Sequence, residues 1–248
     1  MFKFTLRDPK SLKIAVSAMS RLITEANMLY KPEGIIIQAL DSSRIVMVDL
    51  NMPKTYFEDY ICDREELLGI NIELLEDVLR RCKSEELEVL YEDGSGRLKI
   101  TAKGKGVRTF RIPLLTTTTD RIRTPSFTFK CRANILSDAF KATIDDAALF
   151  SDYLKMVFEQ DTIIVSASSE KGDLETRLTI EDGSIIKIEV DEPSAASYSI
   201  EYLDNIMAAS KLSDIMVLQL STNSPLNVQF MMEGDAKIQY YLAPRVEE

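Results

Sequence analysis

Paired carboxylates are the side chains of this sequence whose spacing could support chemistry. Glu65-Glu66, Glu85-Glu86 and Asp145-Asp146 are adjacent acids, and carboxylate oxygens are good ligands for Mg²⁺. The chain has 40 acidic and 30 basic residues and a formal net charge of −10, and adjacent acids in so acidic a chain are typical of a solvated face. The solvated face is the favoured interpretation, so we expect no metal, no cofactor and no catalytic residue.

The sequence also lacks the groups on which most hydrolases rely. It contains no histidine, which removes the usual general base, the commonest zinc ligand and any serine–histidine–aspartate triad. A phosphate-binding P-loop needs two glycines at fixed spacing followed by lysine and a hydroxyl residue, and neither Gly94-Ser95-Gly96 nor Gly104-Lys105-Gly106 extends to that pattern. Both glycine pairs favour hairpin turns.

The cysteines and the apolar runs indicate the compartment. Cys62, Cys82 and Cys131 are odd in number, far apart and without a C-x-x-C pair, so we expect reduced, partly buried thiols. No apolar run approaches the roughly 20 residues that span a bilayer, and the start from Met1 to Arg7 lacks the apolar segment of a signal peptide. We expect a cytoplasmic protein with no membrane partner.

The first half of the sequence recurs in the second at an offset of 128 residues. Residues 34–39 (GIIIQA) align with 162–167 (TIIVSA), and 72–79 (IELLEDVL) align with 200–207 (IEYLDNIM). Solenoid and propeller repeats have periods of roughly 20–50 residues, so this longer period predicts a duplicated domain. With 248 residues and 45% hydrophobic residues, each half can form its own core.

Periodicity places two helices in each half. Apolar residues at helical spacing predict a helix from Asp8 to Ile23, and Asn71 is a good N-cap for a helix ending near Cys82. The second half repeats this order, with helices expected from about Asn134 to Phe150 and from about Ile200 to Lys211. We expect strands at 35–40, 44–50, 87–91, 97–102, 107–113, 154–159, 162–168, 175–181, 185–190, 216–221, 226–231 and 237–243.

Two helices and many strands joined by short turns in each half predict an α+β fold of antiparallel sheets with helices on one face. The segment 114–130 contains four consecutive threonines and Pro125, which favour an extended connector. The expected domains are therefore 1–113 and 131–248.

Three stretches resemble the DNA sliding clamps of the proliferating cell nuclear antigen (PCNA) family, in its archaeal form. These are Leu40-Asp41-Ser42-Ser43-Arg44, Gly69-Ile70-Asn71 and the near-terminal segment 240–245 (YYLAPR). The resemblance covers residues 1–245. It implies a non-catalytic, nucleoid-associated ring of three two-domain subunits (nuclear in a eukaryote), through which double-stranded DNA passes without base readout. Such a ring is a replication and repair processivity factor that holds DNA polymerase, flap endonuclease, DNA ligase and a clamp loader through short PIP-type peptides.

The resemblance also implies roles for particular residues. Ring closure would join two strands head to tail, and their charges are roughly complementary. The implied subunit interface comprises Arg108, Phe110 and Arg111 on one strand and Asp173, Glu175 and Arg177 on the other. The implied DNA-facing residues are Lys10, Lys13, Arg21, Arg80, Arg81, Lys83, Lys141 and Lys211. Asp138 and Asp145 flank Lys141 at helical spacing, which weakens the basic character of the second half.

The implied peptide pocket lies on the outer face beneath the connector. By matched position it comprises Leu40, Met47, Ile122, Pro225, Tyr241, Ala243 and Pro244. An exposed apolar pocket is a suitable partner site on physical grounds too. We expect Met47→Glu to abolish peptide binding and to leave the oligomer intact.

Two other interpretations stay open. The chain could be an obligate subunit of a heterotrimeric clamp, which needs sister subunits to close a ring. It could also be an unrelated α+β enzyme with a carboxylate metal site, in which case a metal-dependent nuclease activity would depend on Asp145 and Asp146.

Overall fold

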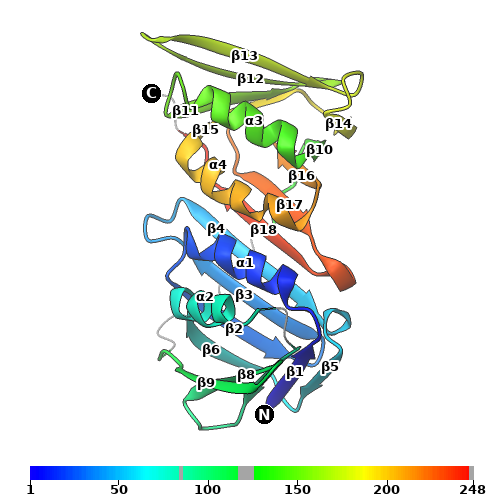
Figure 1. Ribbon diagram of the computed structural model, residues 1–248. Coiled ribbons are helices and arrows are strands. Elements are labelled where there is room, and N and C mark those ends of the chain that lie inside the picture. Colours follow the sequence, from blue (N-terminus) through cyan, green and yellow to red (C-terminus); the bar gives the residue numbers. More distant parts are fainter. Residues whose placement is uncertain (84–85, 117–125, 246–248) are drawn as a thin grey trace. The chain divides into compact units, whose positions relative to one another are not determined.

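The computed structural model describes residues 1–83, 86–116 and 126–245, which form two compact units. Unit 1 comprises Met1–Arg44, Val48–Thr124 and Met231–Ile238. Unit 2 comprises Ile45–Met47, Pro125–Phe230 and Gln239–Glu248. Both units combine antiparallel strands with a pair of helices (Figure 1). The predicted α+β class is confirmed.

Two sets of strands and two helices build the first half of the chain. The strands β1, β7, β8 and β9 form a five-stranded antiparallel sheet with β5, in the order β5-β1-β7-β8-β9, and β4, β3, β2 and β6 follow one another in a second sheet. The elements are β1 (Phe2–Leu6), α1 (Lys10–Ser20), β2 (Glu25–Lys31), β3 (Gly34–Leu40), β4 (Val46–Pro53), β5 (Asp59–Cys62), β6 (Glu66–Asn71), α2 (Ile72–Arg81), β7 (Glu86–Tyr91), β8 (Arg97–Lys103) and β9 (Val107–Pro113).

The two helices of the first half lie side by side (Figure 1), and each has one buried apolar stripe. In α1 this stripe is formed by Leu12, Ala15, Val16 and Met19, all buried. In α2 it is formed by Ile72, Leu75, Val78 and Leu79. Burying such side chains contributes roughly 1.5–3 kcal/mol each, which exceeds what helix propensity supplies.

The second half repeats this arrangement. Its strands follow the orders β14-β10-β16-β17-β18 and β13-β12-β11-β15, and α3 and α4 pack together. The elements are β10 (Cys131–Leu136), α3 (Ser137–Ala147), β11 (Tyr153–Phe158), β12 (Thr162–Ser169), β13 (Gly172–Thr179), β14 (Ile185–Val190), β15 (Ser194–Ser199), α4 (Ile200–Met207), β16 (Ile215–Leu220), β17 (Leu226–Met231) and β18 (Lys237–Leu242).

The structure confirms the duplication element by element. The strands β2, β3 and β6 and the helix α2 begin 128 residues before β11, β12, β15 and α4. Buried positions keep the same offset, because Leu12, Val16 and Met19 of α1 correspond to the buried Phe140, Ile144 and Ala147 of α3. The two halves are therefore one packing arrangement used twice.

Some predicted boundaries are wrong. The helix expected from Asn134 begins at Ser137, because residues 131–136 form β10, which pairs with β14 and β16. The helix expected to reach Lys211 ends at Met207 and continues as a 3₁₀ segment to Leu212. The strand expected at 175–181 lies at Gly172–Thr179. The prediction of three free cysteines, at least partly buried, is confirmed.

The N-terminus of α2 has a side-chain cap that α4 lacks. The Asn71 Oδ1 accepts a hydrogen bond from the Leu74 N–H at 2.7 Å, whereas Ser199, the equivalent residue before α4, caps no backbone group. We expect Asn71→Ala to lower the free energy of unfolding by about 1 kcal/mol. In urea denaturation, Ser199→Ala is the matched control and should change it by less than about 0.5 kcal/mol. Equal losses in the two variants would contradict the assigned cap.

Candidate nucleic-acid and partner interfaces

The first helix presents cations to solvent beside its buried stripe. Lys10 is the first residue of α1 and is exposed, and Arg21 follows the last turn and is also exposed. Lys13 is half-buried, and its Nζ donates hydrogen bonds to the carbonyl oxygens of Cys82, at 2.5 Å, and Lys83, at 3.1 Å. Lys13 therefore ties α1 to the C-terminal end of α2.

The end of α2 adds three further cations. Arg80 and Arg81 lie in its last turn, where cations are favoured by the helix dipole, and Lys83 follows; all three are exposed. Arg80 is bound to Asp77 within the helix and also approaches Glu76, at 4.0 Å. The structure thus brings the six predicted DNA-facing residues of the first half to one helix pair.

The second helix pair places its predicted cations differently. The Lys141 Nζ on α3 is bound to Asp145 one turn later and to Asp204 of α4, at 3.2 Å. The hydrogen bond to Asp145 raises the pKa of Lys141 above its usual value, which favours the charged ammonium in this ion pair. Lys211 lies in the 3₁₀ segment after α4 and is exposed.

The predicted interface residues lie on two edge strands. The strand β9 is the last strand of the order β5-β1-β7-β8-β9, and β13 is the first of β13-β12-β11-β15. On β9, Arg108 and Arg111 are exposed and Phe110 is half-buried; on β13, the side chains at 173, 175 and 177 are exposed. An edge strand presents unpaired backbone groups that can pair with another chain. The Arg177 guanidinium is 3.0 Å from Glu175 on the same strand.

The predicted pocket residues differ in exposure. Leu40 belongs to unit 1 and is 43% exposed, whereas Met47 belongs to unit 2 and is only 5% exposed. A glutamate at position 47 would place a carboxylate in the core, which is costly, so Leu40 is the cleaner probe of the pocket. Ile122 lies outside the described residues. The other predicted members, Pro225, Tyr241, Ala243 and Pro244, belong to unit 2 and are partly exposed.

In two of the stretches that resemble the clamp family, the local structure explains which residue type is present. Asp41 closes the turn after β3: its Oδ2 accepts from the Ser43 N–H at 3.1 Å and its carbonyl from the Arg44 N–H at 3.0 Å. A Cβ at Gly69 would lie 2.8 Å from the Leu115 carbonyl oxygen, so only glycine lets Leu115 pair with β6 at this point.

The third stretch ends in a contact that the sequence did not indicate. The Arg245 guanidinium stacks over the Tyr153 ring, 4.1 Å from its centroid, and the backbone N–H of Arg245 donates to the Ser197 carbonyl at 2.7 Å. Phe127 packs against Tyr241 in the same unit, with centroids 5.9 Å apart. In both contacts the two residues are far apart in the sequence, so no local sequence pattern could have predicted the contact.

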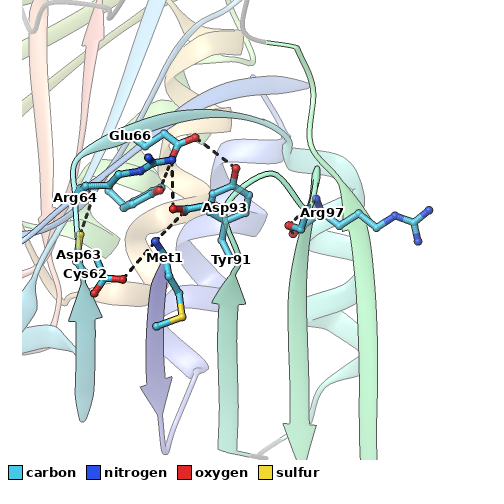
Figure 2. Close-up of polar contacts among 10 residues, drawn as sticks. Met1, Cys62, Asp63, Arg64, Glu66, Tyr91, Asp93 and Arg97 are labelled. Carbon is cyan, nitrogen blue, oxygen red and sulfur yellow. Dashed lines mark hydrogen bonds and ion pairs between the residues drawn. The ribbon is translucent and has the colours of Figure 1, made fainter.

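One acid of each adjacent pair, Glu66, Glu86 and Asp145, is engaged in ion pairs or hydrogen bonds. Figure 2 shows Glu66 in a network with Arg64, Tyr91 and Asp93, and Tyr30 donates to Glu66 at 2.6 Å. The Tyr30 hydrogen bond lowers the pKa of Glu66, which keeps this carboxyl ionised and unsuited to act as a general acid. Glu86 binds Lys103 at 3.1 Å, and Asp145 binds Lys141.

Within the described residues, no group of three or more histidine, cysteine, aspartate or glutamate side chains could hold a metal ion. No described helix is long and apolar enough to cross a membrane. The helix pairs of both units carry exposed charged residues, and both units have open sheet edges, which are surfaces suited to binding and assembly.

Comparison with known proteins identifies the family. The model of the PCNA N-terminal domain matches residues 1–105, and that of the PCNA C-terminal domain matches residues 123–245. The chain belongs to the proliferating cell nuclear antigen family.

Its relatives match over their whole length. A protein of Thermofilum pendens named DNA polymerase sliding clamp is 37% identical over all of both chains. Another of that name, from Thermococcus gammatolerans, is 32% identical over 100% of this chain and 99% of its own. A crystal structure of PCNA from Thermococcus kodakaraensis has the same fold, with a TM-score of 0.92, 24% identity and coverage of 99% of this chain and 100% of that one.

The stacking of Arg245 on Tyr153 predicts how the residues after β18 are held. We expect Tyr153→Ala to remove a cation–π contact worth about 0.5–1 kcal/mol and to speed hydrogen exchange of the Arg245 amide about threefold or more. Tyr153→Phe keeps an aromatic face and should exchange like the original chain. Unchanged exchange in Tyr153→Ala would show that the backbone bond to Ser197 holds this segment alone.

Proposed function

We propose that this chain is a DNA sliding clamp, three copies of which close into a ring around duplex DNA and hold a DNA polymerase on its template. It works without catalysis and without reading bases. Bound enzymes gain processivity because the ring keeps them at a high effective concentration near the DNA.

The observation that carries this proposal is the pair of open edge strands, in a chain that matches the clamp family through both halves. The strand β9 carries Arg108 and Arg111, and β13 carries Asp173 and Glu175. A head-to-tail contact between β9 of one copy and β13 of the next would extend both sheets across the boundary and leave neither β9 nor β13 as a free edge in a closed ring.

The solution mass tests ring closure. We expect about 84 kDa, three times the chain mass of 28.1 kDa, by light scattering on a sizing column. The assembled protein should also lengthen the products of a cognate polymerase on primed circular DNA when a clamp loader is present. A stable 28.1 kDa monomer would instead favour an obligate heterotrimer subunit, to be tested by adding clamp-like sister chains.

Charge reversal tests the assignment of the two strands. Arg108→Glu with Arg111→Glu places like charges across the contact and should shift the mass toward the monomer. Adding Asp173→Lys and Glu175→Lys to the same chain restores opposite charges and should restore the trimer. A trimer that survives the first pair of substitutions unchanged would contradict this interface.

The proposed partners are the polymerase, a clamp loader, a flap endonuclease and a DNA ligase, each bound through a PIP-type peptide at the pocket that includes Leu40. We expect Leu40→Glu to weaken peptide binding at least tenfold by calorimetry, because a charge would replace an apolar contact, and to leave the oligomer mass unchanged. Ile61→Glu is the matched control, since Ile61 is also an exposed apolar residue, at 49%. Equal affinity for both variants would contradict the pocket.

A further inference from the structure

We propose, on the basis of the clamp function proposed above, that each subunit holds the DNA phosphates with only one of its two helix pairs. The pair α1–α2 binds the duplex and the pair α3–α4 does not. The two pairs have the same packing but opposite surface charge.

The duplication allows a position-by-position comparison, since the buried residues of both pairs keep the offset of 128, apart from Ala18, which corresponds to the exposed Asp146. At the exposed positions, the cations of the first pair are mostly lost. Lys10 corresponds to Asp138, Arg21 to Leu149, Arg80 to Ala208 and Arg81 to Ala209; only Lys13 and Lys83 have basic counterparts, Lys141 and Lys211.

The change reverses the net charge of the helix pair. Residues 10–21 and 72–83 contain six cations and three acids, a net charge of +3. The equivalent residues 138–149 and 200–211 contain two cations and five acids, a net charge of −3. Phosphate binding depends on cations that replace the counterions of DNA, so the second pair would repel the backbone.

The surviving cation at position 141 is also neutralised. Its equivalent in the first pair, Lys13, binds backbone carbonyls that carry no net charge. Lys141 binds two carboxylates, and one of them, Asp145, stands at the position that Ser17 occupies in the first pair. Lys141 therefore holds α3 to α4 and is not available to a phosphate.

The residue types at the N-termini of α1 and α3 also support DNA binding by the first helix pair. A lysine at the first position of α1 opposes the helix dipole, so Lys10 does not serve helix stability. The equivalent Asp138 suits the dipole of α3, and its Oδ1 accepts from the Ala139 N–H at 2.8 Å. No acidic partner of the Lys10 ammonium is found among the described residues.

The test compares single variants of the assembled full-length protein. For each variant, fluorescence anisotropy measures the affinity for a labelled linear duplex of about 30 base pairs at several salt concentrations. We expect Lys10→Ala and Arg81→Ala each to reduce the slope of log K against log salt by about 1, and Lys141→Ala to leave it unchanged. Asp138→Lys should add about 1 to the slope and raise the affinity.

Lys155→Ala is the control for net charge. Lys155 is exposed on β11 between the buried Leu154 and Met156, so it lies on the opposite face of the strand from the core. Light scattering and circular dichroism of each variant are the checks that its mass and fold are kept.

The outcomes separate this inference from the clamp function. If the ring supports processive synthesis but Lys141→Ala costs as much affinity as Lys10→Ala, or Asp138→Lys adds none, the inference is overturned and the clamp function stands. If the unmodified protein neither binds the duplex at low salt nor lengthens polymerase products, the clamp function itself is overturned.

Discussion

Each helix pair must bury one apolar stripe against its strands, and this requirement governs everything else about the chain. The stripe sets which residues of α1, α2, α3 and α4 point inward, and it does so at the same positions in both halves. The remaining positions face solvent, where substitutions change stability little. Duplication therefore preserved the packing and left the exposed surface free to acquire different charges.

The sequence predicted the helices better than the strands. The apolar residues of α1 and α2 recur at helical spacing, and Asn71 marked the start of α2, so both were located to within three residues. The strands β2, β6 and β15 had no clear alternation: Ser194–Ser199 is built from small residues and one tyrosine, and Met28, Leu29 and Tyr30 of β2 are consecutively buried. Such strands form because neighbouring strands pair with them, which is information that no local pattern carries.

The same limit applies to the candidate interfaces. The cations of the helices could be found from their spacing along the sequence, whereas the choice of β9 and β13 as an interface came from the resemblance to the clamp family. The partners of these side chains could not be found in this way. Lys141 meets Asp204 on another helix, and Arg245 meets Tyr153 on a strand far earlier in the chain. Tertiary contacts thus decide which of the predicted cations remain available.

The edge strand β13 has a consequence for the chain before it assembles. An open edge that is suitable for one partner strand is equally open to any exposed strand, including those of damaged or nascent proteins. Its exposed residues at 173, 175 and 177 are all charged, and they alternate with less exposed positions. Charges on an open edge disfavour pairing with apolar strands, so the residues proposed to face a neighbouring subunit would also oppose aggregation of a free chain.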